Sequence, residues 1–179
     1  MEERRTCDVV AHHLAEWGYE VQRIGGGVVG TLARGEGPTV LFRADMDALP
    51  VQEATGLAYA SAAPGVMHAC GHDVHVACAL GAARLLAESN APWAGTYVAL
   101  FQPGEETAAG AASMLDDGLT DLVPAPAVAL GQHVLSGEAG TVATAPGPVL
   151  SAGDSIRITV FGDGSHGAMP HLGVDPVVL

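Results

Sequence analysis

Three short apolar runs in this sequence each lead directly into polar residues. Residues 39–42 (TVLF) continue into RADMD, residues 97–101 (YVALF) into QPGEE, and residues 127–130 (AVAL) into GQH. Helical patterns separate the runs, and strands that alternate with helices predict an α/β architecture with a largely parallel central sheet. In open α/β sheets the ligand crevice lies beyond the carboxyl ends of the strands. We therefore expect the three polar segments to converge on one edge of the sheet.

Apolar spacing and turn residues predict the remaining elements. Apolar residues between Val9 and Trp17 recur at helical spacing, and Gly18 is placed to end that helix. Further helices are expected at residues 74–88 and 108–119, and one begins at Asp175. The expected strands are residues 19–24, 28–33, 39–43, 96–101, 127–130 and 156–161, and residues 49–65 are expected to be a loop.

The composition excludes some classes of partner. Twenty acidic side chains against seven basic ones give a formal net charge of −13. Nucleic acid and anionic membranes both need a cationic face, so neither is expected as a partner. No apolar run approaches the length of a membrane span, and the start MEERRTCDVV has no apolar signal core. We therefore expect a cytoplasmic protein.

Residues 68–73 read HACGHD, directly before an expected helix. Cys70 and His72 lie two residues apart in this loop, and a helix start favours the thiolate form of a nearby cysteine. With Glu106 of QPGEE and His133 of GQH, they are the ligand types that hold zinc or manganese. The sequence predicts that these four side chains form a metal site.

Glu105 stands beside Glu106 but is surplus to this ligand set. A spare carboxylate next to a metal site is what a hydrolase needs to take a proton from water. We therefore interpret the chain as a metal-dependent hydrolase with Glu105 as its general base.

Each candidate also has an ordinary structural explanation. An isolated cysteine is more often a small buried residue, so it is the spacing to His72 that favours Cys70 as a ligand. Glu105 and Glu106 could form an acidic helix start. His133 by itself is as often a buried structural histidine as a ligand.

Several other polar residues have open assignments. Asp45 and Asp47 could cap a turn, or they could orient a ligand or a bound water. His68 is expected to support the HACGHD loop without binding the metal itself. Three histidines on predicted helices have no carboxylate or thiol at ligand spacing, and we assign them to the surface or to packing: His12, His13 and His75.

The motifs RADMDALPVQE, HACGHDVH, QPGEE, GQHV and GDGSHGAMPH, in this order, resemble those of the M20 family of metallo-aminoacylases and carboxypeptidases. The resemblance is best to the branch of hippurate hydrolases, N-acyl-amino-acid amidohydrolases and auxin-conjugate hydrolases. It implies a three-layer α/β/α catalytic domain like that of zinc peptidases in residues 1–150. Residues 151–179 would begin an inserted α+β lid and dimerisation domain.

The resemblance also implies roles for single residues. Two divalent metal ions, zinc or manganese with cobalt and nickel as alternatives, would be bound, and Asp47 would support them. His166 would reach from the lid to the scissile carbonyl in the partner subunit of a homodimer or homotetramer. The implied ligands and base are the residues already singled out, namely Cys70, His72, Glu106 and His133, with Glu105 as the base.

Two departures from the family pattern concern the ends of the chain. An upstream histidine-bearing segment is missing, and the family's chains continue well beyond Leu179 to a last histidine ligand. We therefore expect a fragment that is inactive by itself. The parent protein would cleave the amide bond of N-acyl amino acids or similar small conjugates. The alternatives are a truncated, non-catalytic relative and a module that only binds metal.

Overall fold

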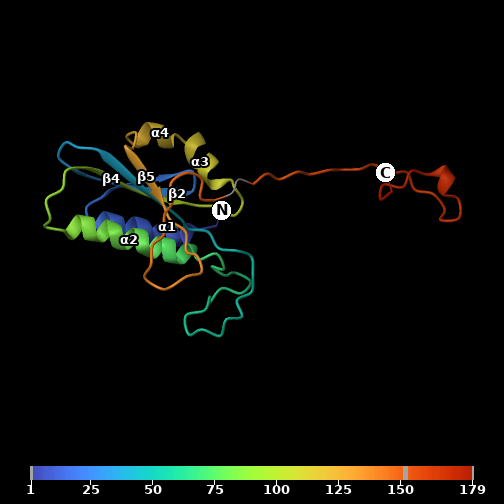
Figure 1. Cartoon of the computed structure of the whole chain (residues 1–179), viewed down its shortest axis with the longest axis horizontal. Coiled ribbons are helices and arrows are strands. Elements are labelled where there is room, and N and C mark those ends of the chain that lie inside the picture. Colours follow the sequence, from blue (N-terminus) through green and yellow to red (C-terminus); the bar gives the residue numbers. More distant parts are fainter. Residues whose placement is uncertain (1, 151–152, 179) are drawn as a thin grey trace. The chain divides into compact units, whose positions relative to one another are not determined.

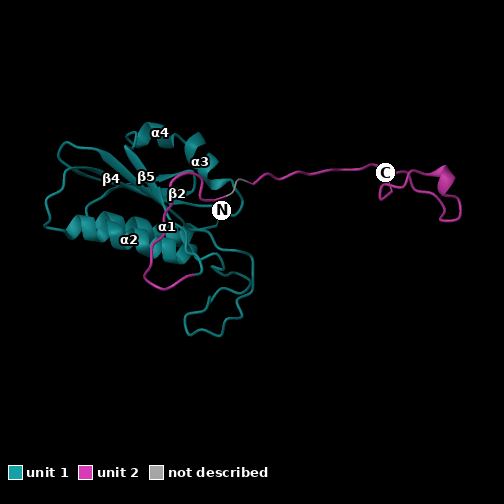
Figure 2. Cartoon of the chain, viewed as in Figure 1, with its two compact units in different colours: residues 1–136 teal, residues 137–179 magenta. Residues whose placement is uncertain are grey.

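The computed structural model of the chain describes residues 2–150 and 153–178. The chain divides into two units, residues 1–136 and residues 137–179 (Figure 2). The assignment of a catalytic domain to residues 1–150 and of a lid to residues 151–179 stays a prediction.

One mixed sheet forms the centre of the first unit (Figure 1). Its five strands lie in the order β1-β2-β4-β3-β5. β3 pairs in parallel with β4 and with β5, whereas β2 pairs antiparallel with β1 and with β4. The expectation of a largely parallel sheet therefore holds only for the half that leads into the polar motifs. The strands are β1 (Glu20–Ile24), β2 (Gly27–Arg34), β3 (Thr39–Asp45), β4 (Gly95–Gln102) and β5 (Val128–Gly131).

Helices cover both faces of this sheet. In Figure 1, α1 (Arg4–Glu16) and α2 (His72–Glu88) lie together on one face, and α3 (Gly110–Asp116) and α4 (Leu119–Leu122) lie on the other. The helix expected at residues 108–119 is shorter, since α3 ends at Asp116, and α4 begins at Leu119 after Gly118, which adopts a left-handed φ of +95°. The three-layer α/β/α arrangement is confirmed.

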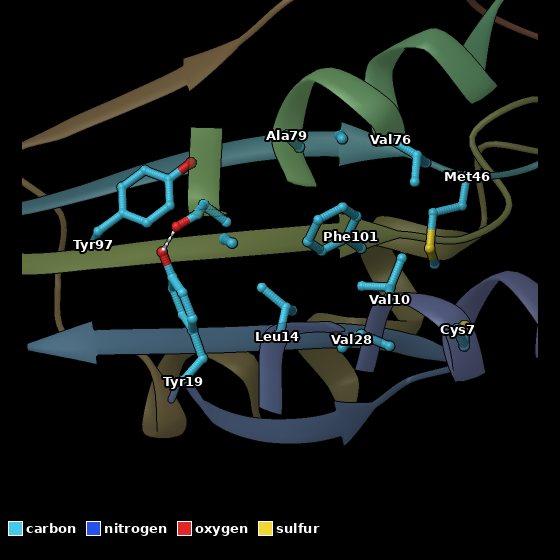
Figure 3. Packing of buried hydrophobic residues seen from close by; sticks show 13 residues of the cluster. Cys7, Val10, Leu14, Tyr19, Val28, Met46, Val76, Ala79, Tyr97 and Phe101 are labelled. Atoms are coloured by element: carbon cyan, nitrogen blue, oxygen red, sulfur yellow. Dashed lines mark hydrogen bonds between the residues drawn. The ribbon is translucent and has the colours of Figure 1, made fainter. Parts of the chain in front are cut away.

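The alternation of side chains along β4 separates two apolar cores. Tyr97 and Phe101 point toward α1 and α2, and Figure 3 shows them packed against residues of those helices. Val98 and Leu100 point the other way, toward α3 and α4. Phe101 is completely buried, and burial of such a side chain contributes about 1.5–3 kcal/mol. The central strand is therefore fixed from both faces.

The second unit has little regular structure among its described residues. The expected strand at residues 156–161 is not formed, and the chain from Asp175 makes a turn, where a helix was expected. A strand needs a paired neighbour, and residues 156–161 have none in the described part of the chain. The unit contains one isolated bridge between Asp163 and Val174 and the 3-10 helix η1 (Pro170–Leu172).

Across residues 2–150 and 153–178, no helix combines the length and the apolar character needed to cross a membrane.

Candidate metal centre

The candidate site lies beyond the carboxyl ends of three neighbouring strands. In the parallel register, Asp45 at the end of β3 lies opposite Gln102 at the end of β4, and Arg43 lies opposite Gly131 at the end of β5. The three polar motifs therefore leave the sheet at the same edge, as the sequence predicts. The start of α2 brings the HACGHD loop to this edge as well.

The structure brings the predicted ligands together around His72. Potential metal-binding atoms lie within 4.8 Å of one another in three groups, and His72 belongs to all of them. The three groups are Cys70, His72 and His133; His72, Glu105 and Glu106; and Asp45, His72 and His75.

The imidazole of His72 is oriented on one side and unpaired on the other. The side chain is fully buried, and its Nδ1 atom lies 3.0 Å from the carbonyl oxygen of Asp47 and 3.1 Å from Oδ1 of that residue. Both neighbours are acceptors, so Nδ1 carries the proton. Nε2 is buried and has no hydrogen-bond partner among the described residues. A buried nitrogen lone pair without a partner is costly, and a metal ion would satisfy it. The residues present therefore fit a metal ion.

Asp47 links His72 to the turn that carries the two glutamates. Its Oδ2 atom accepts a hydrogen bond of 2.9 Å from the backbone N–H of Glu106. Residues 105–108 form a turn, and α3 begins only at Gly110. Glu105 and Glu106 are thus not an acidic helix start. They face the centre from a connection between β4 and α3.

Cys70 and His133 complete the cluster from two loops. The Sγ atom of Cys70 lies 3.4 Å from Nε2 of His133. Nδ1 of His133 lies 2.8 Å from the carbonyl oxygen of Val134, so Nδ1 donates and the Nε2 lone pair faces the thiol. Both side chains retain access to solvent.

The electrostatics of the site differ from the expectation at Cys70. Burial raises the pKa of the Cys70 thiol, and the neighbouring carboxylates, Glu106 foremost, raise it further. The prediction that the start of α2 favours a thiolate is therefore wrong here, because burial and the neighbouring carboxylates both act against the charged form. Excess carboxylate charge around soft and imidazole ligands favours a bound cation.

Asp45 and His75 form a buried pair that sequence reasoning missed. His75 was assigned to the surface or to packing, but it is fully buried and its Nδ1 atom lies 2.6 Å from Oδ1 of Asp45. Burial by itself would raise the pKa of Asp45, but the hydrogen bond to His75 and the charge of Arg43 hold that pKa below its ordinary value. The signal available in the sequence was the three-residue spacing of His72 and His75, which places both on one face of α2.

His166 belongs to the second unit, and its role stays a prediction. Locally it closes a turn, because its Nδ1 atom accepts from the backbone N–H of Ala168 at 3.1 Å and its carbonyl oxygen accepts from that of Met169 at 2.7 Å.

A cleft of about 920 Å³ in the first unit lies away from these ligands. Its lining comes from the start of α1, the β1–β2 turn and α3, and includes Arg4, Arg23 and Asp117. None of the candidate ligands lines this cleft.

Comparison with known proteins agrees with this arrangement. A model of peptidase family M20/M25/M40 matches residues 41–176. The chain is 42% identical over 181 residues to an N-acetyl-L-cysteine deacetylase of Bacillus subtilis, which covers 99% of this chain and 43% of that relative. It is 41% identical over 154 residues to an IAA-amino acid hydrolase of Arabidopsis thaliana, which covers 85% of this chain and 34% of that relative.

A solved structure shows the same similarity. A dinuclear metal-binding peptidase of the M20 family from Bacillus subtilis superimposes with a TM-score of 0.65 at 41% identity, over 73% of this chain and 37% of that chain. The chain spans less than half the length of each of these three relatives. The match of the family model over most of the sequence shows that the chain belongs to peptidase family M20/M25/M40.

Proposed function

We propose that the whole protein is a metal-dependent amidohydrolase that cleaves the amide bond of N-acyl amino acids or similar small conjugates. The observation that carries this proposal is the position of Glu105. Its carboxylate belongs to one group with His72 and Glu106, although Glu106 already offers a carboxylate ligand at that place. The names of two relatives, an N-acetyl-L-cysteine deacetylase and an IAA-amino acid hydrolase, support the substrate class.

The proposed ligands of two divalent metal ions are Cys70, His72, Glu106 and His133. Thiolate and imidazole suit zinc, while imidazole and carboxylate also suit manganese, cobalt and nickel. When bound, such ions lower the pKa of water and polarise a carbonyl group. Asp47 supports two of these ligands. It orients the ring of His72, and it accepts a hydrogen bond from the backbone N–H of Glu106.

Glu105 would move the proton that amide hydrolysis requires. Its carboxylate takes a proton from the attacking water while the new C–O bond forms, and it returns the proton to the nitrogen as the C–N bond breaks. The products are a carboxylic acid and a free amine. His166 is proposed to stabilise the negative charge on the scissile carbonyl oxygen, from the lid of a partner subunit in a homodimer or homotetramer. A cytoplasmic location is part of the same proposal.

The proposal is tested by removing the metal from the purified whole protein and restoring it. Hydrolysis of a panel of N-acetyl and N-benzoyl amino acids should disappear with a chelator and return with zinc, manganese or cobalt. Retained turnover after complete removal of metal would contradict the proposal. Metal binding without turnover of any N-acyl amino acid would favour the module that only binds metal.

The ligand set is tested by elemental analysis of variants. Cys70→Ser and His72→Ala should each lower the metal content per chain, because each removes a proposed ligand. Cys78→Ser and His12→Ala are matched controls, since both side chains are exposed, on α2 and α1, and neither belongs to the groups of potential ligands. Unchanged metal content in both Cys70→Ser and His72→Ala would end the assignment.

A further inference from the structure

We propose that Asp45 and His75 are positioning residues that hold the segment after β5 so that His133 faces the metal centre. The inference rests on the proposed function, because it assigns His133 to the metal. It concerns two residues that are not themselves proposed as ligands. It is based on the observation that both ring nitrogens of His75 form hydrogen bonds within the protein.

The hydrogen bonds of His75 determine its protonation. The backbone N–H of Val134 donates to Nε2 of His75 at 2.9 Å, so Nε2 carries a lone pair and no proton. Nδ1 must then carry the proton and donate it to Oδ1 of Asp45 at 2.6 Å. His75 is therefore a neutral imidazole with its proton on Nδ1. No nitrogen lone pair is left for a metal, in contrast to His72, whose Nε2 is unpaired in the described structure.

The bond from Val134 fixes the residue that directly follows His133. β5 ends at Gly131, and the register with β3 extends no further. Among the described residues, one hydrogen bond joins the backbone of residues 132–136 to α2. In this bond the backbone N–H of Val134 donates to the side chain of His75. The rings of His75 and His133 meet edge to face with centroids 4.7 Å apart. The position of His133 thus depends on its contact with His75.

Further polar contacts connect the Asp45–His75 pair to the sheet. The Oδ2 atom of Asp45 lies 2.7 Å from Nη1 of Arg43, and Nε of Arg43 donates to Oε1 of Gln102 at 3.0 Å. These contacts therefore connect β4, β3, α2 and the segment after β5. Asp45 is 1% exposed and His75 is fully buried, so loss of either partner leaves a buried polar group unsatisfied.

The tautomer of His75 is the first test, because it needs no variant. Long-range ¹H–¹⁵N correlation on the metal-free whole protein should show a neutral ring protonated at Nδ1. A ring protonated at Nε2 would overturn the proposal.

Two substitutions of His75 then separate its two contacts. The amide oxygen of His75→Gln reaches the place of Nε2 and can accept from Val134, whereas His75→Asn reaches only the place of Nδ1. We expect His75→Asn to speed hydrogen exchange of the Val134 amide by about tenfold and to weaken zinc binding by about 10–100-fold. His75→Gln loses only the contact with Asp45, so it should change both quantities by a smaller factor than His75→Asn.

The outcomes distinguish this inference from the proposed function. Equal exchange and equal zinc affinity in the two folded variants would overturn the positioning role, as would faster exchange with unchanged zinc affinity. In either case the metal site stands if Cys70→Ser and His72→Ala lose metal. If those two variants keep their metal, the ligand assignment fails instead, whatever the state of His75.

Discussion

Asp47 contacts the Nδ1 atom of His72 twice, with its backbone carbonyl oxygen at 3.0 Å and with Oδ1 at 3.1 Å. The second carboxylate oxygen accepts the backbone N–H of Glu106. One buried aspartate thus orients an imidazole on α2 and a turn after β4 toward the same point. An outer partner of this kind fixes the ring and raises the basicity of the ligand nitrogen.

Asp47→Ala should weaken metal binding by about 10–100-fold, the usual effect of removing a residue that orients a ligand. Zinc competition with a chromophoric chelator measures the affinity. Asp73→Ala is the matched control, since Asp73 follows His72 on the exposed side of α2. Equal affinities in the two variants would show that Asp47 does not support the site.

Gly71→Ala should destabilise the protein and disturb the site. Gly71 has a φ of +81°, and an added Cβ would clash with a methyl carbon of Val134. The left-handed backbone alone costs a residue with a side chain about 1–2 kcal/mol. Gly81→Ala in α2 is the control, because nothing lies within 4 Å of its added Cβ and alanine favours the helix by up to about 1 kcal/mol. Thermal unfolding should therefore shift in opposite directions, and a lower Tm for Gly81→Ala than for Gly71→Ala would contradict this account.

The loop between β3 and α2 should loosen in acid. Glu53 accepts hydrogen bonds from the hydroxyl of Thr55 at 2.6 Å and from the backbone N–H of Ser61 at 2.7 Å. These bonds lower the pKa of Glu53 below its ordinary value of 4.5, the Thr55 bond most. Because the pKa of Glu53 is lower in the folded protein, these bonds stabilise the loop fully above about pH 4.5. This stabilisation is lost as the pH falls through the pKa of the folded state.

The amide resonance of Ser61 reports this titration directly. It should shift with a midpoint below 4.5, and the shift should vanish in Glu53→Gln. Glu36→Gln, in the exposed turn before β3, should leave it unchanged. A midpoint at or above 4.5 would show that Glu53 does not hold the loop.

Local patterns were sufficient for the elements that position the site. The apolar runs at β3, β4 and β5 and the helical spacing in α2 predict a common edge, and the register of Asp45 with Gln102 shows that edge. The spacing of His72 and His75 could place both on one face of α2, but the role of His75 also depends on Asp45, which lies thirty residues earlier in the chain. Spacing within one helix cannot reveal a partner on a strand.

The remaining differences also come from long-range contacts. The antiparallel pairing of β2 with β4 joins residues far apart in the sequence. The alternating pattern of residues 156–161 describes a strand only when another strand pairs with it. At Cys70, the helix start was visible in the sequence, but the carboxylates that raise its pKa come from other segments.

We propose that Glu105 and Glu106, adjacent in one turn, have different tasks. This proposal is tested most directly by measuring metal content and turnover of an N-acyl amino acid for Glu105→Gln and Glu106→Gln in the whole protein. We expect Glu105→Gln to keep its metal and to lose at least about a hundredfold in kcat, while Glu106→Gln should lose metal together with activity. Near wild-type turnover in a metal-loaded Glu105→Gln would contradict it.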